Sequence, residues 1–529
     1  MDDAPAAQAP TRLSVWIGAL LIITAGAALL VPFLDRPWTA NEANAGAFYG
    51  SFNVNYERFG FWHMYGLEAG PIAHELKASI GYLNHPPAMA WLIYFAGMDE
   101  WQMRLPTVVS VIVLGLLVFA WLTPRIGVLS ACAAGIIVQL PPTMSVHGQI
   151  SYELTTAVLG WGMIMAFDRV LARGRFTVGT SAVTVLCAFA GPWFDWSFLY
   201  VYCPALVPLM WRRVDLSTGV RRLAVPATSA TVSLALLLWW RVVVSTADHL
   251  PAVPDHQTGL WEIYSRTLAE FAERGLGDTL RWTWFTIRTG FTLPLLVIAG
   301  IGLLPMLRRV PRVVAVLSLA FVHPALFPSH AIDHPMFFVY AAPLVAISAA
   351  CAAAAIAARL PQWVGRIAQA GVLAVAIAAP AISAWSHLEN TTQSFYKDLG
   401  SVLTAAVEHD NWEAGEPLGY NVGHSWPYGA YHAYLDSTRV VGFAVVDAKT
   451  LAAAPAGGAP RGLRYLWLRY GEVPAFAKDD FAQSAELEAL LNSFPRKRVP
   501  ILETRVDVTG RGDVVEIREA WLVTLREPG

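Results

Sequence analysis

The chain has 529 residues, of which 55% are hydrophobic and only 14% are charged. Soluble domains carry about 25% charged residues, so this composition excludes an ordinary water-soluble enzyme. The 37 Lys and Arg nearly balance the 39 Asp and Glu, which argues against a nucleic-acid-binding protein. The four cysteines lie in apolar runs without disulfide or CxxC metal spacing. We therefore expect a polytopic membrane protein.

Runs of about 20 apolar residues can cross a bilayer as helices. The first run is too long for a cleavable signal peptide and lacks a clear cleavage site, so we interpret it as a span. In chain order, the sequence predicts eleven spans, at 13–34, 103–122, 126–141, 151–168, 176–191, 197–211, 223–243, 289–307, 313–328, 336–358 and 367–385.

Arginine is concentrated in one set of alternate loops, which hold Arg125, Arg169, Arg173, Arg175, Arg212, Arg213, Arg221, Arg222, Arg308, Arg309, Arg312, Arg359 and Arg366. Because positive loops favour the cytoplasm, we expect a cytoplasmic amino terminus and an extracytoplasmic carboxyl terminus in the cell (inner or plasma) membrane. This topology places all nine histidines of the membrane region at the outer side. Either the inner loops are too short to hold histidine, or an outer cavity recognises an anionic head group.

Two outer loops are long, at about 35–102 and 244–288, and the chain becomes richer in charge from about residue 386. Strand-like runs follow at Arg439–Asp447, Arg464–Tyr470, Val499–Val508 and Asp513–Leu525, with a helix-like stretch at Asp479–Leu491. We expect a helical membrane domain at 1–385 and a small extracytoplasmic α/β or α+β domain at 386–529.

The first outer loop contains two conspicuous segments. It opens with Asn41-Glu42, and a carboxylate so close to the bilayer is costly unless it is functional. Glu42 could instead cap the helix that follows, because acids favour the first turn. The loop ends with His85-Pro86-Pro87, whose prolines favour a helix start after them. His85 would then stand at a helix entrance, where a phosphate binds well.

Three further outer segments place polar side chains beside spans. His330 and His334, with Asp333 between them, could contact a phosphate, bind a metal or form a structural turn. Glu153 stands at the entrance of an apolar helix and needs a partner. Asp195 lies between aromatic residues, which fits recognition of a sugar or lipid head group and fits a plain interfacial belt equally well.

Together these segments resemble the GT-C class of membrane glycosyltransferases. The likeness is to the family 39 type, which includes the dolichyl-phosphate-mannose–protein mannosyltransferases and the bacterial lipid A aminoarabinose transferases. It covers about residues 13–385. The matching stretches are Asn41-Glu42-Ala43 with Phe48-Tyr49, then 82–87, 101–106, 194–196 and 334–338.

The resemblance implies transfer of a hexosyl or pentosyl group from a polyprenyl-phosphate donor to a glycan, lipid or protein acceptor at the outer face, with inversion. By position, Glu42 would be the base, and His85, His330 and His334 would contact the donor phosphate. Asp195 and Glu153 are further candidates for binding the donor phosphate or sugar, and Arg58 and Arg104 are weaker ones. We predict no metal ligand, although a divalent cation (Mg²⁺ or Mn²⁺) could assist the reaction.

Two alternatives stay open. Many relatives have an Asp-Glu pair where this chain has Asn41-Glu42, which favours a noncatalytic envelope assembly protein on the same bundle. A lipid or solute transporter is the other alternative. Transporters usually place ionisable groups near the bilayer centre and often show repeated halves, and the sequence shows neither feature.

Overall fold

The computed structural model describes residues 11–35, 40–70, 76–83, 85–145, 150–210, 214–253, 260–309, 313–327, 335–390, 418–420, 464–470, 489, 491–492, 494–499, 504–507 and 514–524. The chain divides into two compact units. Unit 1 comprises residues 1–34, 104–240 and 259–390, and unit 2 comprises residues 35–103, 241–258 and 391–529. The predicted domain division at residue 385 stays a prediction.

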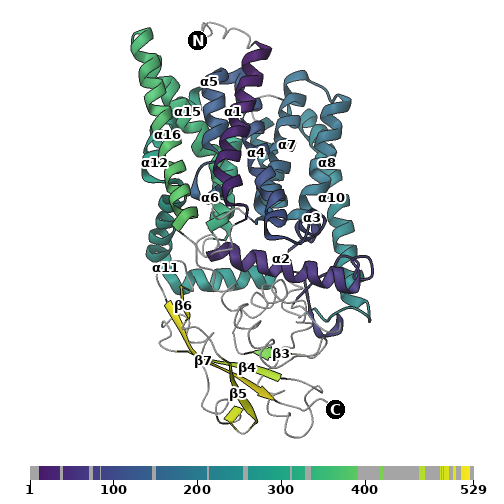
Figure 1. Ribbon diagram of the computed structural model, residues 1–529. Helices are drawn as coiled ribbons and strands as arrows, with labels where there is room; N and C mark the ends of the chain where they lie inside the picture. The colour runs from purple at the N-terminus through teal and green to yellow at the C-terminus, as the bar shows by residue number, and fades with distance from the viewer. Residues whose placement is uncertain are drawn as a thin grey trace. The chain divides into compact units, whose positions relative to one another are not determined.

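Unit 1 is a helical bundle (Figure 1). Its helices are α1 (Arg12–Leu30), α4 (Glu100–Ile126), α5 (Val128–Ile137), α6 (Pro142–Ser145), α7 (Tyr152–Arg173), α8 (Val178–Phe194), α9 (Cys203–Met210), α10 (Leu216–Thr246), α11 (Leu260–Phe291), α12 (Leu293–Arg309), α13 (Val313–Leu326), α15 (Ala342–Ala357) and α16 (Gln362–Asn390), with short 3-10 helices η1 (Val31–Phe33) and η5 (Pro335–Ala341) and π-helix η3 (Phe198–Tyr202). The first residues of α4 and the last of α10 belong to unit 2.

Each predicted span coincides with a helix or a pair of consecutive helices in the described part of the chain. Six helical segments are long and apolar enough to cross a membrane alone, or seven if the bent pair α11–α12 counts as one. The protein is therefore a multi-pass membrane protein, as the composition predicts. Because α5, α8 and the η3–α9 segment are apolar but shorter, the count of eleven spans stays a prediction.

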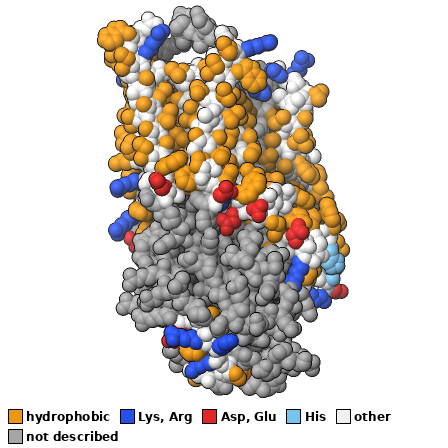
Figure 2. Space-filling view, in the orientation of Figure 1, with side chains coloured by type: hydrophobic (Ala, Val, Ile, Leu, Met, Phe, Trp, Pro, Cys, Tyr) orange, Lys and Arg blue, Asp and Glu red, His pale blue; other side chains and the backbone are white. Residues whose placement is uncertain are grey.

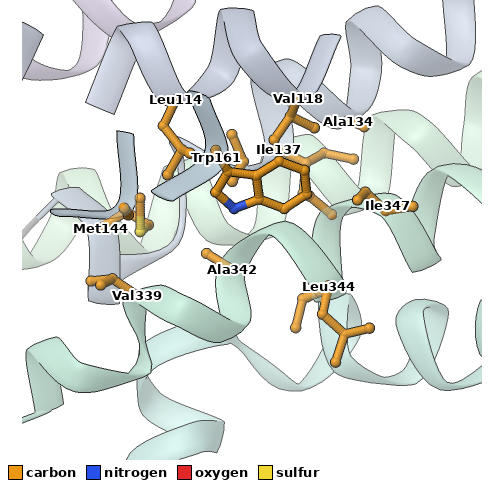
Figure 3. Packing of buried hydrophobic residues seen from close by; sticks show 14 of the residues in the cluster. Leu114, Val118, Ala134, Ile137, Met144, Trp161, Val339, Ala342, Leu344 and Ile347 are labelled. Carbon is orange, nitrogen blue, oxygen red and sulfur yellow. The ribbon is translucent and has the colours of Figure 1, made fainter. Parts of the chain in front are cut away.

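The core of unit 1 is apolar and closely packed. Trp161 of α7 is 0% exposed and lies at its centre. Figure 3 shows around it Leu114 and Val118 of α4, Ala134 and Ile137 of α5, Met144 of α6, Val339 of η5, and Ala342, Leu344 and Ile347 of α15. A charged or polar group buried in such surroundings is costly unless it is hydrogen-bonded, so each buried acid of this unit needs an explanation.

The outer surface of unit 1 is also apolar. Large hydrophobic side chains point outward from α1, α10, α12 and α16, and Figure 2 shows them covering the helices. Contiguous exposed apolar surface of this extent is typical of helices that face lipid.

A buried ion pair joins α4 to α7. Arg125, in the last turn of α4, pairs with Asp168 of α7, and its guanidinium lies 4.5 Å from the ring centroid of Trp121. The Asp168 side chain is 3% exposed. Both residues lie near the ends of helices that lead into the arginine-rich loops, which the sequence predicts to be cytoplasmic. The positions of the two termini stay predictions.

One predicted loop is largely helical. The outer loop at 244–288 contains most of α11, and the span predicted at 289–307 begins instead at Leu293. Thr292 has a φ of +66°, which interrupts the helix, and the segments Gly275–Phe291 and Leu293–Arg308 meet at 99°. The predicted span therefore joins residues of two differently directed helices.

Unit 2 includes the predicted first outer loop. It contains α2 (Ala40–Phe59), β1 (Glu68–Gly70), η2 (Leu76–Ala78), β2 (Ile80–Tyr82) and α3 (Ala88–Ala96). The strands β1 and β2 are antiparallel, with Glu68 opposite Tyr82. The Asn55 amide of α2 donates to the Ala69 carbonyl at 2.7 Å and so ties the helix to the hairpin. Helix α3 begins directly after Pro87, as predicted.

The described C-terminal strands form one five-stranded sheet within unit 2. They are β3 (Leu418–Tyr420), β4 (Arg464–Tyr470), β5 (Arg496–Val499), β6 (Thr504–Asp507) and β7 (Val514–Thr524). β7 pairs antiparallel with β4, β5 and β6, and β3 is parallel to β4. The strand predicted at Arg464–Tyr470 is confirmed. The runs predicted at Arg439–Asp447 and Asp479–Leu491 lie wholly or mostly outside the described residues.

Candidate active site

Besides Asp168, which is paired with Arg125, two acids are buried in the apolar bundle of unit 1, and the sequence singled out both. Glu153 is 0% exposed and Asp195 is 3% exposed. Glu153 lies in the first turn of α7, after the cap residue Ser151. Its Oε2 accepts a hydrogen bond from the Ser151 hydroxyl, while Oε1 has no hydrogen-bond partner among the described residues. The positive end of the α7 dipole offsets part of the cost of burying an acid here.

Asp195 is held by one neighbouring group and by one group that is distant in the sequence. Helix α8 ends at Phe194, and the Asp195 backbone is extended. Its Oδ2 accepts hydrogen bonds from the Ser197 hydroxyl, two residues later, and from the Tyr340 hydroxyl of η5 at 3.3 Å. Ser197 and Tyr340 also hydrogen-bond to each other. Because Ser197 and Tyr340 are 0% and 1% exposed, the triad is a buried network.

The two carboxyl groups belong to one cluster. Glu153 and Asp195 lie close enough to repel each other electrostatically, and each of them also interacts electrostatically with Tyr200. The Tyr200 hydroxyl hydrogen-bonds to His323 Nδ1 of α13 at 2.8 Å. The His323 ring stacks on Phe337 with centroids 3.9 Å apart. Segments from four parts of the sequence therefore converge on these acids.

This cluster can accept hydrogen bonds from a ligand. Glu153 has no Lys or Arg partner in the described part of the chain. A buried carboxylate with an unpaired oxygen costs free energy, and such groups persist chiefly at functional sites. An acceptor of this kind suits ligand hydroxyl groups, which donate hydrogen bonds.

The other predicted site residues are placed as follows. Glu42 lies in the first turn of α2, and its side chain is outside the described residues. Arg58, in the last turn of α2, lies 5.7 Å from the Phe59 ring. His85 is half-buried, with its ring 6.1 Å from that of Tyr82. Arg104 is fully buried in unit 1 and donates to the Leu34 carbonyl.

His330 and His334 lie outside the described residues. Their contact with a phosphate or metal therefore stays a prediction. Among the residues that the structure describes, no group of three or more His, Cys, Asp or Glu is arranged to hold a metal ion. The assisting divalent cation also stays a prediction.

Sequence reasoning missed Ser197 and Tyr340 as hydrogen-bond partners of Asp195. It also missed Tyr200 and its partner His323 as neighbours of the acids. Ser197 and Tyr340 contact each other across 143 residues of sequence, and no local pattern predicts such a pair. One weak signal existed. Tyr340 is a polar residue two positions after the stretch 334–338 that was quoted for the family resemblance.

Sequence reasoning also passed over Glu68 as a site candidate. Glu68 of β1 is 1% exposed, and neither of its carboxyl oxygens has a hydrogen-bond partner among the described residues. Burial raises the pKa of this carboxyl well above its usual value. Glu68 is therefore a second unpaired buried acid, on the hairpin strand opposite Tyr82.

Comparison with known proteins identifies the fold. No protein-family model matches the sequence, and no curated protein matches it. Among solved structures, the chain is similar to ArnT from Cupriavidus metallidurans in the apo state, with 15% identity, a TM-score of 0.60 and 98% of each chain covered. ArnT bound to undecaprenyl phosphate gives 14% identity and a TM-score of 0.52, covering 98% of this chain and 99% of that one.

A third similar structure is the archaeal oligosaccharyltransferase AglB from Archaeoglobus fulgidus, in complex with an inhibitory peptide and a dolichol-phosphate. It shares 11% identity with a TM-score of 0.53, covering 92% of this chain and 72% of that one. These neighbours are GT-C membrane glycosyltransferases, so the chain has the GT-C fold that its sequence motifs predict. At such low identity the likeness establishes the fold.

Proposed function

We propose that the protein is an integral membrane glycosyltransferase, which moves a sugar from a polyprenyl-phosphate donor to an acceptor at the outer face of the membrane. The observation that carries this proposal is the agreement of 98% of the chain with the ArnT fold. ArnT has been solved with undecaprenyl phosphate and AglB with a dolichol-phosphate. A donor of the same chemistry, a sugar on a polyprenyl phosphate, fits this chain best.

The buried acids suggest how the sugar is held. Glu153 offers an unpaired carboxylate oxygen, and Asp195 is oriented by Ser197 and Tyr340. Both acids accept hydrogen bonds, and sugar hydroxyls donate them. In this proposal the Glu153–Asp195 cluster binds the sugar, and its separation from bulk water strengthens those hydrogen bonds.

The transfer step requires a base and a stabilised leaving group. The acceptor hydroxyl oxygen bonds to the anomeric carbon as the bond from that carbon to the phosphate oxygen breaks, which inverts the centre. The hydroxyl proton passes to Glu42, and the electron pair leaves with the lipid phosphate. His85, His330 and His334 stabilise that phosphate, with Arg58 and Arg104 as weaker candidates.

The proposal also includes the acceptor, the transferred sugar, a divalent cation and the membrane topology. The acceptor is a glycan, a lipid or a protein of the cell envelope, and the transferred group is a hexose or pentose. Mg²⁺ or Mn²⁺ could assist by neutralising the phosphate. The amino terminus lies in the cytoplasm and the C-terminal domain outside, because the arginine-rich loops favour the inner side.

Transfer by the purified protein tests this proposal. The protein in lipid nanodiscs is supplied with polyprenyl-phosphate sugars and an envelope extract, and release of polyprenyl phosphate is measured. We expect Glu42→Gln to abolish release while the protein still folds. Glu57→Gln, on the exposed side of the same helix, is the matched control and keeps its activity. Normal release by Glu42→Gln would refute the assignment of the base.

A further inference from the structure

The second half of α11 has an unusual distribution of side chains. Over Gly275–Phe291 the buried residues include Thr279 and Thr286, which are 4% and 6% exposed. Leu280 and Trp284, by contrast, are 60% and 52% exposed. A surface helix of a soluble protein buries its apolar side chains and exposes its polar ones. This segment departs from that pattern, because it buries two threonines and exposes Leu280 and Trp284. Its exposed apolar side chains suit an apolar environment.

The direction of this segment differs from that of the helix that follows. Gly275–Phe291 meets Leu293–Arg308 at 99°, and Figure 1 shows α11 lying across the direction of the bundle helices. The exposed apolar residues of α12 form a stripe along its whole length, at Leu293, Val297, Ile301, Leu304 and Leu307. A stripe of this kind faces lipid along a crossing helix, so a segment at right angles to it runs along the membrane plane.

Two arginines extend from the same segment. Arg281 and Arg288 are exposed and seven residues apart, so they share one helix face, opposite the buried threonines. Within the described part of the chain neither guanidinium has a hydrogen bond, an ion pair or a ring contact. Guanidinium groups bind phosphate oxygens in a bidentate manner, and the half-exposed Trp282 and Trp284 are typical of the membrane interface.

We propose that Gly275–Phe291 is an interfacial helix seated in the phospholipid headgroup layer. Its leucine and aromatic side chains contact acyl chains, and Arg281 and Arg288 bind lipid phosphates. The threonine side packs on the bundle, where a Cβ on Gly290 would lie 2.3 Å from Thr143 Oγ1 of α6. The proposal does not depend on sugar transfer, because it rests on the exposure and direction of this segment alone.

Depth measurements with spin labels test the proposal. In a variant with its four cysteines replaced by alanine, single cysteines are introduced by Leu276→Cys, Leu280→Cys and Phe285→Cys, labelled, and reconstituted in phospholipid bilayers. Relative accessibility to oxygen and to a water-soluble nickel chelate gives the depth of each label. The control pair, Val297→Cys and Leu307→Cys, lies on α12, ten residues or about 15 Å apart along the axis.

We expect the three α11 labels to share one depth, at the headgroup level, and the two α12 labels to differ in depth. Graded depths along α11 would overturn the proposal in favour of a re-entrant segment, and full water accessibility of all three labels would also overturn it.

A second experiment tests the role of the arginines. With Arg281→Glu and Arg288→Glu together, the Leu280→Cys label should shift toward water. Arg359→Glu with Arg366→Glu is the control and leaves that label in place. An unchanged depth in the first pair would remove the arginines from the proposal.

Discussion

Glu153 is the residue at which stability and function are expected to conflict. Its carboxyl group is fully buried, one oxygen has no partner in the described structure, and Asp195 adds a second negative charge nearby. Asp168 is buried to a similar degree but is paired with Arg125. In the described part of the bundle, Asp168 therefore has a charged partner and Glu153 has none.

We predict opposite effects from neutralising these two acids. Glu153→Gln removes a buried carboxyl group that lies beside a second acid, so thermal stability in detergent should be unchanged or higher. Sugar transfer should fall by about 10-fold or more, because a hydrogen bond to a charged group contributes about 1.5–3 kcal/mol. Asp168→Asn removes the carboxylate that pairs with Arg125 and should lower stability by about 3–5 kcal/mol.

Melting temperature and transfer rate, measured on the same preparations, check this prediction. A large loss of stability in Glu153→Gln would show that the acid has a structural role. Equal transfer by Glu153→Gln and the unmodified protein would remove it from the sugar site.

Glu68 predicts a pH dependence of stability. Its folded pKa lies well above the usual 4.5 because of burial, so the folded protein retains a proton that the unfolded chain releases. Stability from this group is fully present below about pH 4.5 and is lost as pH rises toward the folded pKa. Relative to the unmodified protein, Glu68→Gln should therefore become more stable as pH rises from 5 to 8. Melting curves across that range, with the exposed Glu57→Gln as control, would contradict this if the difference stayed constant.

At the residue scale, the sequence identified both acids of the bundle cluster but not their partners. Glu153 and Asp195 stood out because an acid beside an apolar run is costly. The Tyr340 hydroxyl reaches Asp195 across 145 residues of sequence, and such a contact depends on how the helices pack. Glu68 was overlooked because nothing around it in the sequence indicates that the hairpin would bury it.

At the scale of elements, two glycines of α12 differ sharply in their surroundings. A Cβ on Gly302 would lie 1.8 Å from the Ser348 backbone oxygen of α15, whereas a Cβ on Gly300 would meet nothing within 4 Å. The Ser348 hydroxyl donates to the Ala299 carbonyl at the same crossing. Gly302 therefore permits the close approach of α12 and α15.

We predict that Gly302→Ala lowers the melting temperature, since overpacking costs about 1–3 kcal/mol. Gly300→Ala should leave it unchanged or raise it, because alanine is the better helix former. Thermal unfolding of both variants in one detergent checks this prediction. Equal melting temperatures would contradict the close packing at Gly302.

The sequence predicted the membrane-spanning helices better than it predicted α11, which lies across their direction. A long apolar run is visible without knowledge of the fold, so the predicted spans coincide with helices. Helix α11 has no long apolar run and was interpreted as a loop. The break at Thr292 carries only a weak signal, Pro294 in the first turn of α12. Helix direction depends on packing, and apolar periodicity alone does not report it.

At the scale of the whole molecule, composition and motifs predicted a multi-pass protein with a GT-C fold. The chain aligns with ArnT over 98% of both chains. The balanced net charge of −2 conceals arginine-rich loops on one set of turns and acids on the other. The fold explains why a few motifs spread between residues 41 and 338 were informative, since one architecture holds them in place.

The activity that we propose is transfer of a sugar from a polyprenyl phosphate to an envelope acceptor. Mass spectrometry of envelope glycans and glycolipids tests this activity most directly, on cells with the protein, without it, and with the Glu42→Gln variant. We predict a product heavier by one sugar that requires the protein and is absent with Glu42→Gln, while unused polyprenyl-phosphate sugar accumulates. Identical envelope profiles in all three cell lines would contradict the claim.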